Sequence, residues 1–303
     1  MSVASTTARE VTASVVATGR SRDRTPRSLI FLALLWFSLF FGVMVLVALI
    51  VDTAIQGAGR FDAALITDYS SRVRPETTGF RAGIIGSLWL MAFTALMAVP
   101  LGIAAALYLE EFADKDRWYN RLIELNLQNL AAVPSIIYGL LAVAVMALIG
   151  FQQTGIVLGG AIALALLILP VIIITTREAV RSVPQDIRQG SLALGATVWQ
   201  TTWRQTLPSA VPGIATGTIL GLSRAIGEAA PLIVVGLAGS LLFSPTGVLS
   251  PITALPMQIY SLTSQSQAEL REAASAAIIV LLVMILGLNA LAIFIRNKFQ
   301  RSW

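Results

Sequence analysis

Two side chains of opposite charge, Arg224 and Glu228, lie in an apolar stretch that is long enough to cross a membrane. The guanidinium group of an arginine presents a planar fork of donors, which matches the oxygen atoms of a phosphate group. A carboxylate beside it can accept a proton-bearing oxygen of hydrogen phosphate and would repel a fully deprotonated anion such as sulfate. These two residues are therefore our candidates for contacts along an anion pathway.

A purely structural role is the alternative, in which Arg224 and Glu228 neutralise each other four positions apart on one helix. Two considerations weigh against it. A cation placed N-terminal to its anion is the less favourable order on a helix, and apolar side chains would stabilise a span better than a buried ion pair. Charged side chains at mid-membrane usually face a bundle interior or a watery pathway.

The composition identifies a membrane protein. Of 303 residues, 56% are hydrophobic and only 12% are charged, whereas a soluble domain carries roughly 25% charged residues. This balance excludes a water-soluble enzyme, and the net charge of +5 is better explained by membrane topology than by nucleic-acid binding. The absence of Cys and His removes thiolate nucleophiles, His bases and Cys- or His-ligated metals. We expect no catalytic residue, no metal and no cofactor.

Six apolar runs are each close to the ~20 residues that a membrane-spanning helix needs. We therefore predict an all-α polytopic fold with transmembrane helices at about 29–51, 83–109, 127–149, 155–175, 211–237 and 273–295. A Ser-, Thr- and Arg-rich arm at residues 1–28 is expected to be disordered. Residues 52–82 and 238–270 form external segments, and residues 296–303 form a short tail. Pro134 lies inside the third span and predicts a kink there.

Positive charge is unevenly divided between the two sides of this predicted fold. With six spans, both termini lie on one side. Of the 21 Lys and Arg residues, 15 fall on that side, five fall on the other, and Arg224 lies within a span. The positive-inside rule therefore places both termini, the charged loop 110–124 and the polar segment 177–208 in the cytoplasm.

The polar segment 177–208 lies between the fourth and fifth spans. Ser182 and Gln185 fit a capping box, and Pro184 lies in the first turn, where no backbone donor is lost. Gly195 interrupts the pattern part-way. We predict two short surface helices joined by a turn near Gly195.

Two tryptophans in this segment, Trp199 and Trp203, lie four positions apart and share a helix face. Pro208 and Pro212 then interrupt backbone hydrogen bonding before the next span. An ordinary cytoplasmic loop lying on the membrane, with tryptophans in the interfacial belt, would show the same pattern.

Small residues recur every four positions in the fifth span and form a smooth ridge, which lets a neighbouring helix approach closely. The pattern predicts that this span packs inside the bundle. The ridge consists of Gly213, Gly217, Gly221, Ala225 and Ala229.

The run from Arg177 to Pro231 resembles the permease subunits of bacterial binding-protein-dependent ABC importers. Their cytoplasmic signature is Glu-Ala-Ala, three residues, Gly, nine residues, Ile, one residue and Leu-Pro. The matches at that spacing are Gly195, Leu207 and Pro208. In place of the tripeptide stand Gln189, Gly190 and Ser191, and in place of the isoleucine stands Gln205.

A more specific resemblance begins at Ser223. The run SRAIGEAAPL, Ser223–Leu232, is similar to the phosphate-specific importer permeases, and so is VPSIIYGL, Val133–Leu140. The runs TALPMQIY, Thr253–Tyr260, and ALAIFIRNKFQR, Ala290–Arg301, resemble the A-type permease subunit of these importers rather than its C-type partner. The resemblance covers roughly residues 80–301.

The resemblance implies a type I ABC importer permease core (MetI-like) over residues 83–295, in a bacterial plasma membrane. It implies inorganic phosphate as the substrate and three partners: a second, homologous permease, a dimer of ATPase subunits and an external phosphate-binding protein. ATP would be bound and hydrolysed by the ATPase and not by this chain. The segment 177–208 would couple to that ATPase through Gln189, Gly190, Ser191, Gly195, Leu207 and Pro208.

Three alternatives stay open. A permease of the same kind could carry another oxyanion, such as sulfate, molybdate or phosphonate. A proton-driven secondary transporter with Glu228 as proton carrier would explain a buried carboxylate, but it would not explain the spacing of Gly195 and Leu207. An intramembrane enzyme would depend on carboxylates or on Ser and Lys, and both lysines lie in polar segments.

Overall fold

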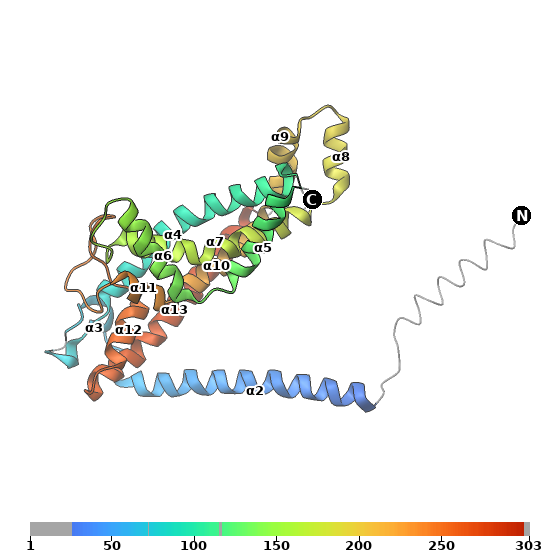
Figure 1. Cartoon of the computed structure of the whole chain (residues 1–303). Helices are drawn as coiled ribbons and strands as arrows, with labels where there is room; N and C mark the ends of the chain where they lie inside the picture. The colour runs from blue at the N-terminus through green and yellow to red at the C-terminus, as the bar shows by residue number, and fades with distance from the viewer. Residues whose placement is uncertain (1–25, 72, 115–116, 300–303) are drawn as a thin grey trace, which may run out of the picture. The chain divides into compact units, whose positions relative to one another are not determined.

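The computed structural model describes residues 26–299 except for 72, 115 and 116. It divides into two units, 1–52 and 53–303. The first unit contains most of helix α2 (Pro26–Gly57; Figure 1). Every side chain from Pro26 to Val51 is exposed within this chain. The helix begins three residues inside the predicted disordered arm 1–28; residues 1–25 of that arm lie outside the described residues.

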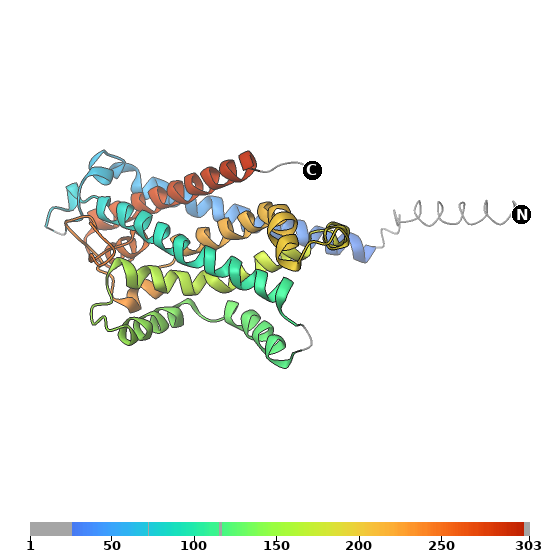
Figure 2. The ribbon, with the colours of Figure 1, turned by 90° about the horizontal axis from the view of Figure 1, so that it is seen from above.

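The second unit is built around α7 (Val157–Arg181), which is apolar around most of its circumference and is buried accordingly. It packs most extensively against α4 (Arg81–Leu107) and α10 (Leu207–Ile226), and Figure 2 shows these three helices side by side. The fourth helix of comparable length, α13 (Ala268–Phe299), packs against α10. The four helices form the frame on which the charged residues are placed.

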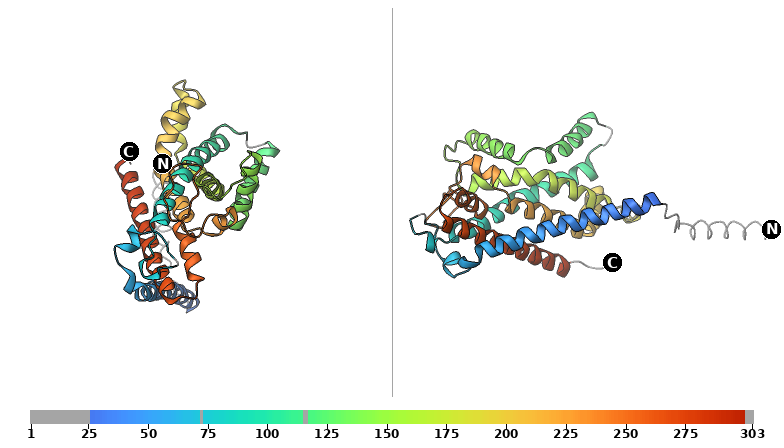
Figure 3. Two further views of the ribbon diagram at one scale, coloured as in Figure 1. Left: turned by 90° about the vertical axis from the view of Figure 1, so that its left-hand side faces the viewer. Right: turned by 90° about the horizontal axis from the view of Figure 1, so that it is seen from below.

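The third predicted span is not one kinked helix. It consists of α5 (Trp118–Ala131) and α6 (Ser135–Leu148), which meet at a bend of 115° (Figure 3). Pro134 causes the break, because a proline disfavours helical backbone at the residue before it and is itself extended here, with ψ of 136°. The predicted loop 110–124 is therefore partly helical, because it begins inside a π-helical turn, η3 (Tyr108–Phe112), and continues as α5 from Trp118.

The predicted fifth span, 211–237, is also broken. Its first part, α10, begins earlier than predicted, at Leu207, and includes both Pro208 and Pro212. After Ile226 the helix stops, and α11 (Ala230–Val235) follows. Pro231 explains the stop, because its ring would clash with the carbonyl group of residue 227 and it has no N–H to donate.

The described residues contain four helices that are long and apolar enough to cross a membrane, namely α2, α4, α7 and α13. The bent pair α5 and α6 makes a fifth if it is counted as one span. With α10, which is 20 residues long, the structure is compatible with the six predicted spans. The all-α prediction is confirmed across the described residues, where the only bridge, Ile156 with Pro251, is isolated.

The two segments predicted as external loops contain short helices. Residues 52–82 include η1 (Ala58–Arg60), α3 (Ala64–Thr67) and η2 (Pro75–Thr77). The segment 238–270 includes α12 (Leu255–Thr263), whose apolar face packs on α13 and α4. Both segments contribute to one apolar cluster, consisting chiefly of Leu65, Phe80, Leu255, Leu262 and Leu270.

Candidate functional site

The charge pair lies at the break between α10 and α11. Arg224 is in the last turn of α10, whereas Glu228 lies beyond its end, in the break. The Nε atom of Arg224 is 3.6 Å from Oε1 of Glu228, and the two side chains are 42% and 23% exposed within this chain. The expected arrangement along one continuous helix is thus wrong, although the pairing itself is present. Both side chains remain accessible to a ligand.

Helix α6 holds this break in place. A Cβ atom added to Gly139 of α6 would lie 2.6 Å from the carbonyl oxygen of Pro231, so only glycine permits so close an approach. The neighbouring Tyr138 is buried, lies within electrostatic range of Arg224 and donates from its hydroxyl group to the carbonyl of Leu130 (2.6 Å). The two interrupted spans therefore meet beside the charge pair. Interrupted helices at membrane depth are tolerated where they are buried in protein or line a cavity.

The glycine ridge of α10 faces α7. An added Cβ atom would lie 2.6 Å from Cβ of Ala179 at Gly213 and would collide with Thr175 at Gly217, whereas at Gly221 it would be 3.4 Å from Ile172. Ala229 lies outside α10. The ridge seats α10 tightly against the central helix, which fixes the height at which Arg224 emerges.

The polar segment forms two surface helices, α8 (Gln185–Ala193) and α9 (Val198–Thr201), as predicted. Figure 1 shows them extending beyond the end of α4. Gly195 makes the turn between them with φ of +84°, which favours glycine. The segment then passes through a π-helical turn, η4 (Thr202–Thr206), into α10.

The predicted capping box at Ser182 and Gln185 is wrong. Ser182 closes α7 instead, and its hydroxyl group donates to the carbonyl of Ala179 (2.8 Å). A capping box is present fifteen residues downstream, where Thr197 and Gln200 cap α9 reciprocally. The closeness of two helix boundaries explains the error, because Ser182, the C-cap of α7, lies only two residues before Pro184, the N-cap of α8.

The residues expected to contact an ATPase do not form a single patch. Gly190, Ser191 and Gly195 line a hollow of about 570 Å³ between α8 and the α9–η4 region. The Ser191 and Thr201 hydroxyl groups are 2.9 Å apart and join the two sides of this hollow. Gln189 is exposed on α8, whereas Leu207 and Pro208 lie at the start of α10, away from the hollow. Leu194, at the rim, is 91% exposed.

A cluster of ion pairs next to this segment was not predicted as functional. Glu110 accepts from Arg177 (3.4 Å) and Arg181 (3.1 Å), and its side chain is only 3% exposed. The pairs that complete the cluster are Arg177 with Glu124 (2.9 Å) and Arg188 with Glu111 (3.0 Å). These residues lie in the polar segments 110–124 and 177–208, and of their charges only the Lys and Arg were used, to assign topology.

Comparison with known proteins settles the family. The model described as "Binding-protein-dependent transport system inner membrane component" matches residues 98–303, more than half of the chain. The chain belongs to this permease family. The permease is thus a multi-pass inner-membrane protein.

Among curated relatives, the permease is 31% identical to the "Phosphate transport system permease protein PstA" of Yersinia pestis, over 91% of this chain and 92% of the relative. It is 36% identical to the protein of the same name from Mycobacterium leprae, over 72% of this chain and 71% of the relative.

Solved structures show the fold. The permease matches a chain of a bacterial alginate ABC transporter in complex with an alginate-bound periplasmic protein, with a TM-score of 0.67, 19% identity, and coverage of 91% of this chain and 97% of the other. It also matches a chain of the MetNI methionine ABC transporter with a TM-score of 0.57, 16% identity, and coverage of 73% and 98%. These likenesses support the predicted type I importer permease core.

Proposed function

We propose that this permease forms the translocation pathway of an ATP-driven importer of inorganic phosphate. The single observation that carries the proposal is the accessible Arg224–Glu228 pair at the break between α10 and α11. The phosphate-system relatives support the same substrate. The guanidinium group of Arg224 would donate hydrogen bonds to phosphate oxygens, and the Glu228 carboxylate would accept a hydrogen bond from the protonated oxygen of hydrogen phosphate.

The ion pair is weak enough to be displaced by the substrate. At 3.6 Å and with the arginine side chain 42% exposed, such a pair contributes only about 0–1 kcal/mol where water reaches it. A phosphate ion can therefore replace the Glu228 carboxylate at Arg224 and be released again. Transport requires this, since a tight site would hold the ion.

The rest of the proposed machinery lies in partner subunits. A second, homologous permease completes the pathway, an external phosphate-binding protein delivers the ion, and an ATPase dimer binds and hydrolyses ATP. The hollow between α8 and α9 is the proposed contact with that ATPase, as a helix held in a groove. Movement of this segment would alternate the spans between inward-open and outward-open states. The distribution of Lys and Arg supports cytoplasmic termini.

The test is ATP-dependent uptake of labelled phosphate into proteoliposomes that contain the full complex. We expect Arg224→Gln to lower uptake at least about tenfold, since hydrogen bonds to a charged group contribute roughly 1.5–3 kcal/mol. Arg117→Gln is the matched control, because Arg117 pairs with Asp114 on the exposed surface and its loss should leave uptake unchanged.

Normal uptake by Arg224→Gln would remove the charge pair from the pathway. No ATP-dependent phosphate uptake by the unaltered complex would overturn the substrate assignment. Uptake driven by a proton gradient without ATP would instead indicate a secondary transporter.

A further inference from the structure

The C-terminal end of α4 widens into a π-helical turn, η3 (Tyr108–Phe112). Single π-helical turns in proteins are frequent at functional sites. This turn contains three consecutive residues that reach other elements: Glu110, Glu111 and Phe112. Helix α4 is far from the segment 182–206 in sequence, so any mechanical link between them is made by side chains.

The first link joins η3 to α8. The Nη2 atom of Arg188 lies 3.0 Å from Oε1 of Glu111, and the two side chains are 13% and 9% exposed. The same nitrogen atom donates to the carbonyl group of Val180 near the end of α7 (2.6 Å). Arg188 therefore fastens α8 to both α4 and α7.

The second link joins η3 to α9. The ring centroids of Phe112 and Trp199 are 5.9 Å apart, and Trp199 in turn contacts Trp203 of η4 at 5.4 Å. Aromatic pairs at such separations are attractive beyond the area that they bury. Both helices of the polar segment are thus attached to the same turn of α4.

A third set of contacts makes η3 a firm base for these links. Glu110, from the same turn, is held by Arg177 and Arg181 of α7. The ends of α4 and α7 are consequently joined to each other through the buried Glu110 carboxylate, directly before the residues that lead into α8. Removing one partner of such a buried pair is costly, because the remaining charge is left uncompensated.

The backbone beside this cluster contains two places where the polar segment could bend. Only residues 182–184 separate α7 from α8, and residues 194–197, which include Gly195 with its positive φ, separate α8 from α9. Force applied to the exposed face of α8 would rotate it about these joints unless side chains resist. The pairs Arg188–Glu111 and Phe112–Trp199, which we call the clamp, are positioned to resist that rotation.

We propose that the clamp holds the polar segment rigidly to the ends of α4 and α7, so that force on α8 and α9 moves the spans instead of bending the joints. Arg188 is then a positioning residue for transport, which it influences without touching the substrate. The inference rests on the proposed function for its transport readout. When the clamp is broken, ATP should still be hydrolysed, but less phosphate should be transported for each ATP.

The main experiment measures phosphate uptake and ATP hydrolysis by the full complex in the same proteoliposomes. We expect Arg188→Gln and Glu111→Gln each to lower uptake per ATP at least about fivefold, the low end of typical coupling between sites. The exchanged variant, Arg188→Glu with Glu111→Arg, should recover at least half of the lost ratio. Arg117→Gln is again the matched control, because its ion pair lies outside the clamp.

An unchanged ratio in Arg188→Gln would overturn the proposal, and so would an exchanged variant no better than the single variants. If Arg188→Gln fails to assemble, a cross-link decides the question. The chain has no Cys, so a flexible bifunctional maleimide on Phe112→Cys with Trp199→Cys joins only those positions. Retained uptake after cross-linking supports a rigid clamp, and lost uptake shows that the two positions must separate.

A measurement that does not depend on phosphate uptake tests the clamp separately from the proposed function. Spin labels at Leu101→Cys on α4 and Gln185→Cys on α8 report the distance between the two helices with and without ATP. The clamp requires a constant distance in the unaltered complex and a variable one in Arg188→Gln. If the unaltered complex takes up no phosphate, the substrate assignment fails while this distance still tests the clamp.

Discussion

At the scale of single residues, the proposed function makes Glu228 the residue that selects which oxyanions bind beside Arg224. Its carboxylate lies 3.6 Å from the guanidinium group, so an anion bound there meets a negative charge unless the anion carries a proton. Hydrogen phosphate does so and sulfate does not. We therefore expect Glu228→Gln to admit sulfate, measured as inhibition of labelled phosphate uptake by excess sulfate. A variant that still ignores sulfate would show that selectivity arises elsewhere.

The glycines of the ridge are not equivalent, although the sequence makes them look so. A methyl group at Gly217 would collide with Thr175 of α7, whereas at Gly221 it would make an ordinary contact with Ile172. We expect Gly217→Ala to destabilise the purified complex by about 1–3 kcal/mol, the usual effect of overpacking, and Gly221→Ala to change it little. Thermal unfolding of the two variants measures the difference. Equal melting temperatures would contradict the observed packing of α10 on α7.

At the scale of elements, the turn at Gly195 sets the angle between α8 and α9. A side chain at its φ of +84° is strained, by roughly 1–2 kcal/mol for a residue in the left-handed region. Gly195→Ala should therefore weaken binding of the ATPase, measured by co-purification. Gly150→Ala is the control, because Gly150 has a similar φ of +87°, meets nothing within 4 Å and lies between α6 and α7, outside the polar segment. Equal co-purification would mean that this turn does not shape the contact.

The elements show what the sequence could and could not predict. Apolar runs locate α2, α4, α7 and α13 well, because burial in lipid and burial in protein select the same residues. The sequence predicts one kinked helix for the third span and one continuous helix for the fifth, since apolar composition alone does not reveal a stop. Pro134 and Pro231 mark the positions of the two interruptions. A proline in a span can cause a mild kink or a complete break, and packing against neighbouring helices decides which of the two occurs.

The sequence likewise predicted one part of the candidate site and missed another. Arg224 and Glu228 were identifiable because a charge in an apolar run is conspicuous in sequence. The cluster around Glu110 was not, because its members come from four different elements, η3, α5, α7 and α8, and each looks in sequence like an ordinary charge in a polar segment. Its significance arises only when the fold brings these four elements into contact.

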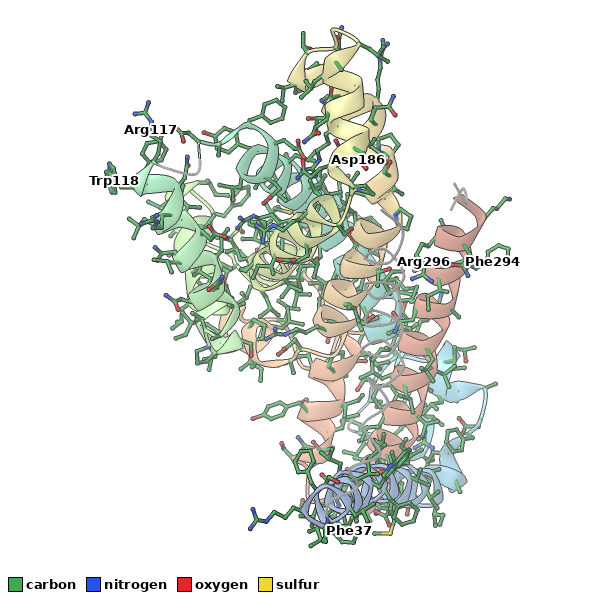
Figure 4. The ribbon with its side chains drawn as sticks, turned by 90° about the vertical axis from the view of Figure 1, so that its right-hand side faces the viewer. Phe37, Arg117, Trp118, Asp186, Phe294 and Arg296 are labelled. Atoms are coloured by element: carbon green, nitrogen blue, oxygen red, sulfur yellow. The ribbon has the colours of Figure 1, made fainter. Side chains whose placement is uncertain are left out.

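At the scale of the whole molecule, the proposed orientation places two exposed positions on opposite sides of the membrane. Val73, in the external segment, is 91% exposed, and Trp118, at the start of α5, is 74% exposed and points away from the neighbouring helices (Figure 4). With no native Cys, a membrane-impermeant maleimide should label Val73→Cys in intact cells. It should label Trp118→Cys only after the membrane is opened. The reverse pattern would invert the proposed orientation.

The mutual neutralisation of Arg224 and Glu228 has an electrical consequence. No other charged residue lies in the middle of α4, α6, α7, α10 or α13, so this chain contributes no fixed net charge at the depth of the break. A phosphate ion passing that point would carry its negative charge against the inside-negative membrane potential. Each elementary charge costs about 2.3 kcal/mol per 100 mV. Part of the free energy of ATP hydrolysis would then be used to move the ion against the membrane potential, and only the remainder would sustain the concentration gradient of phosphate.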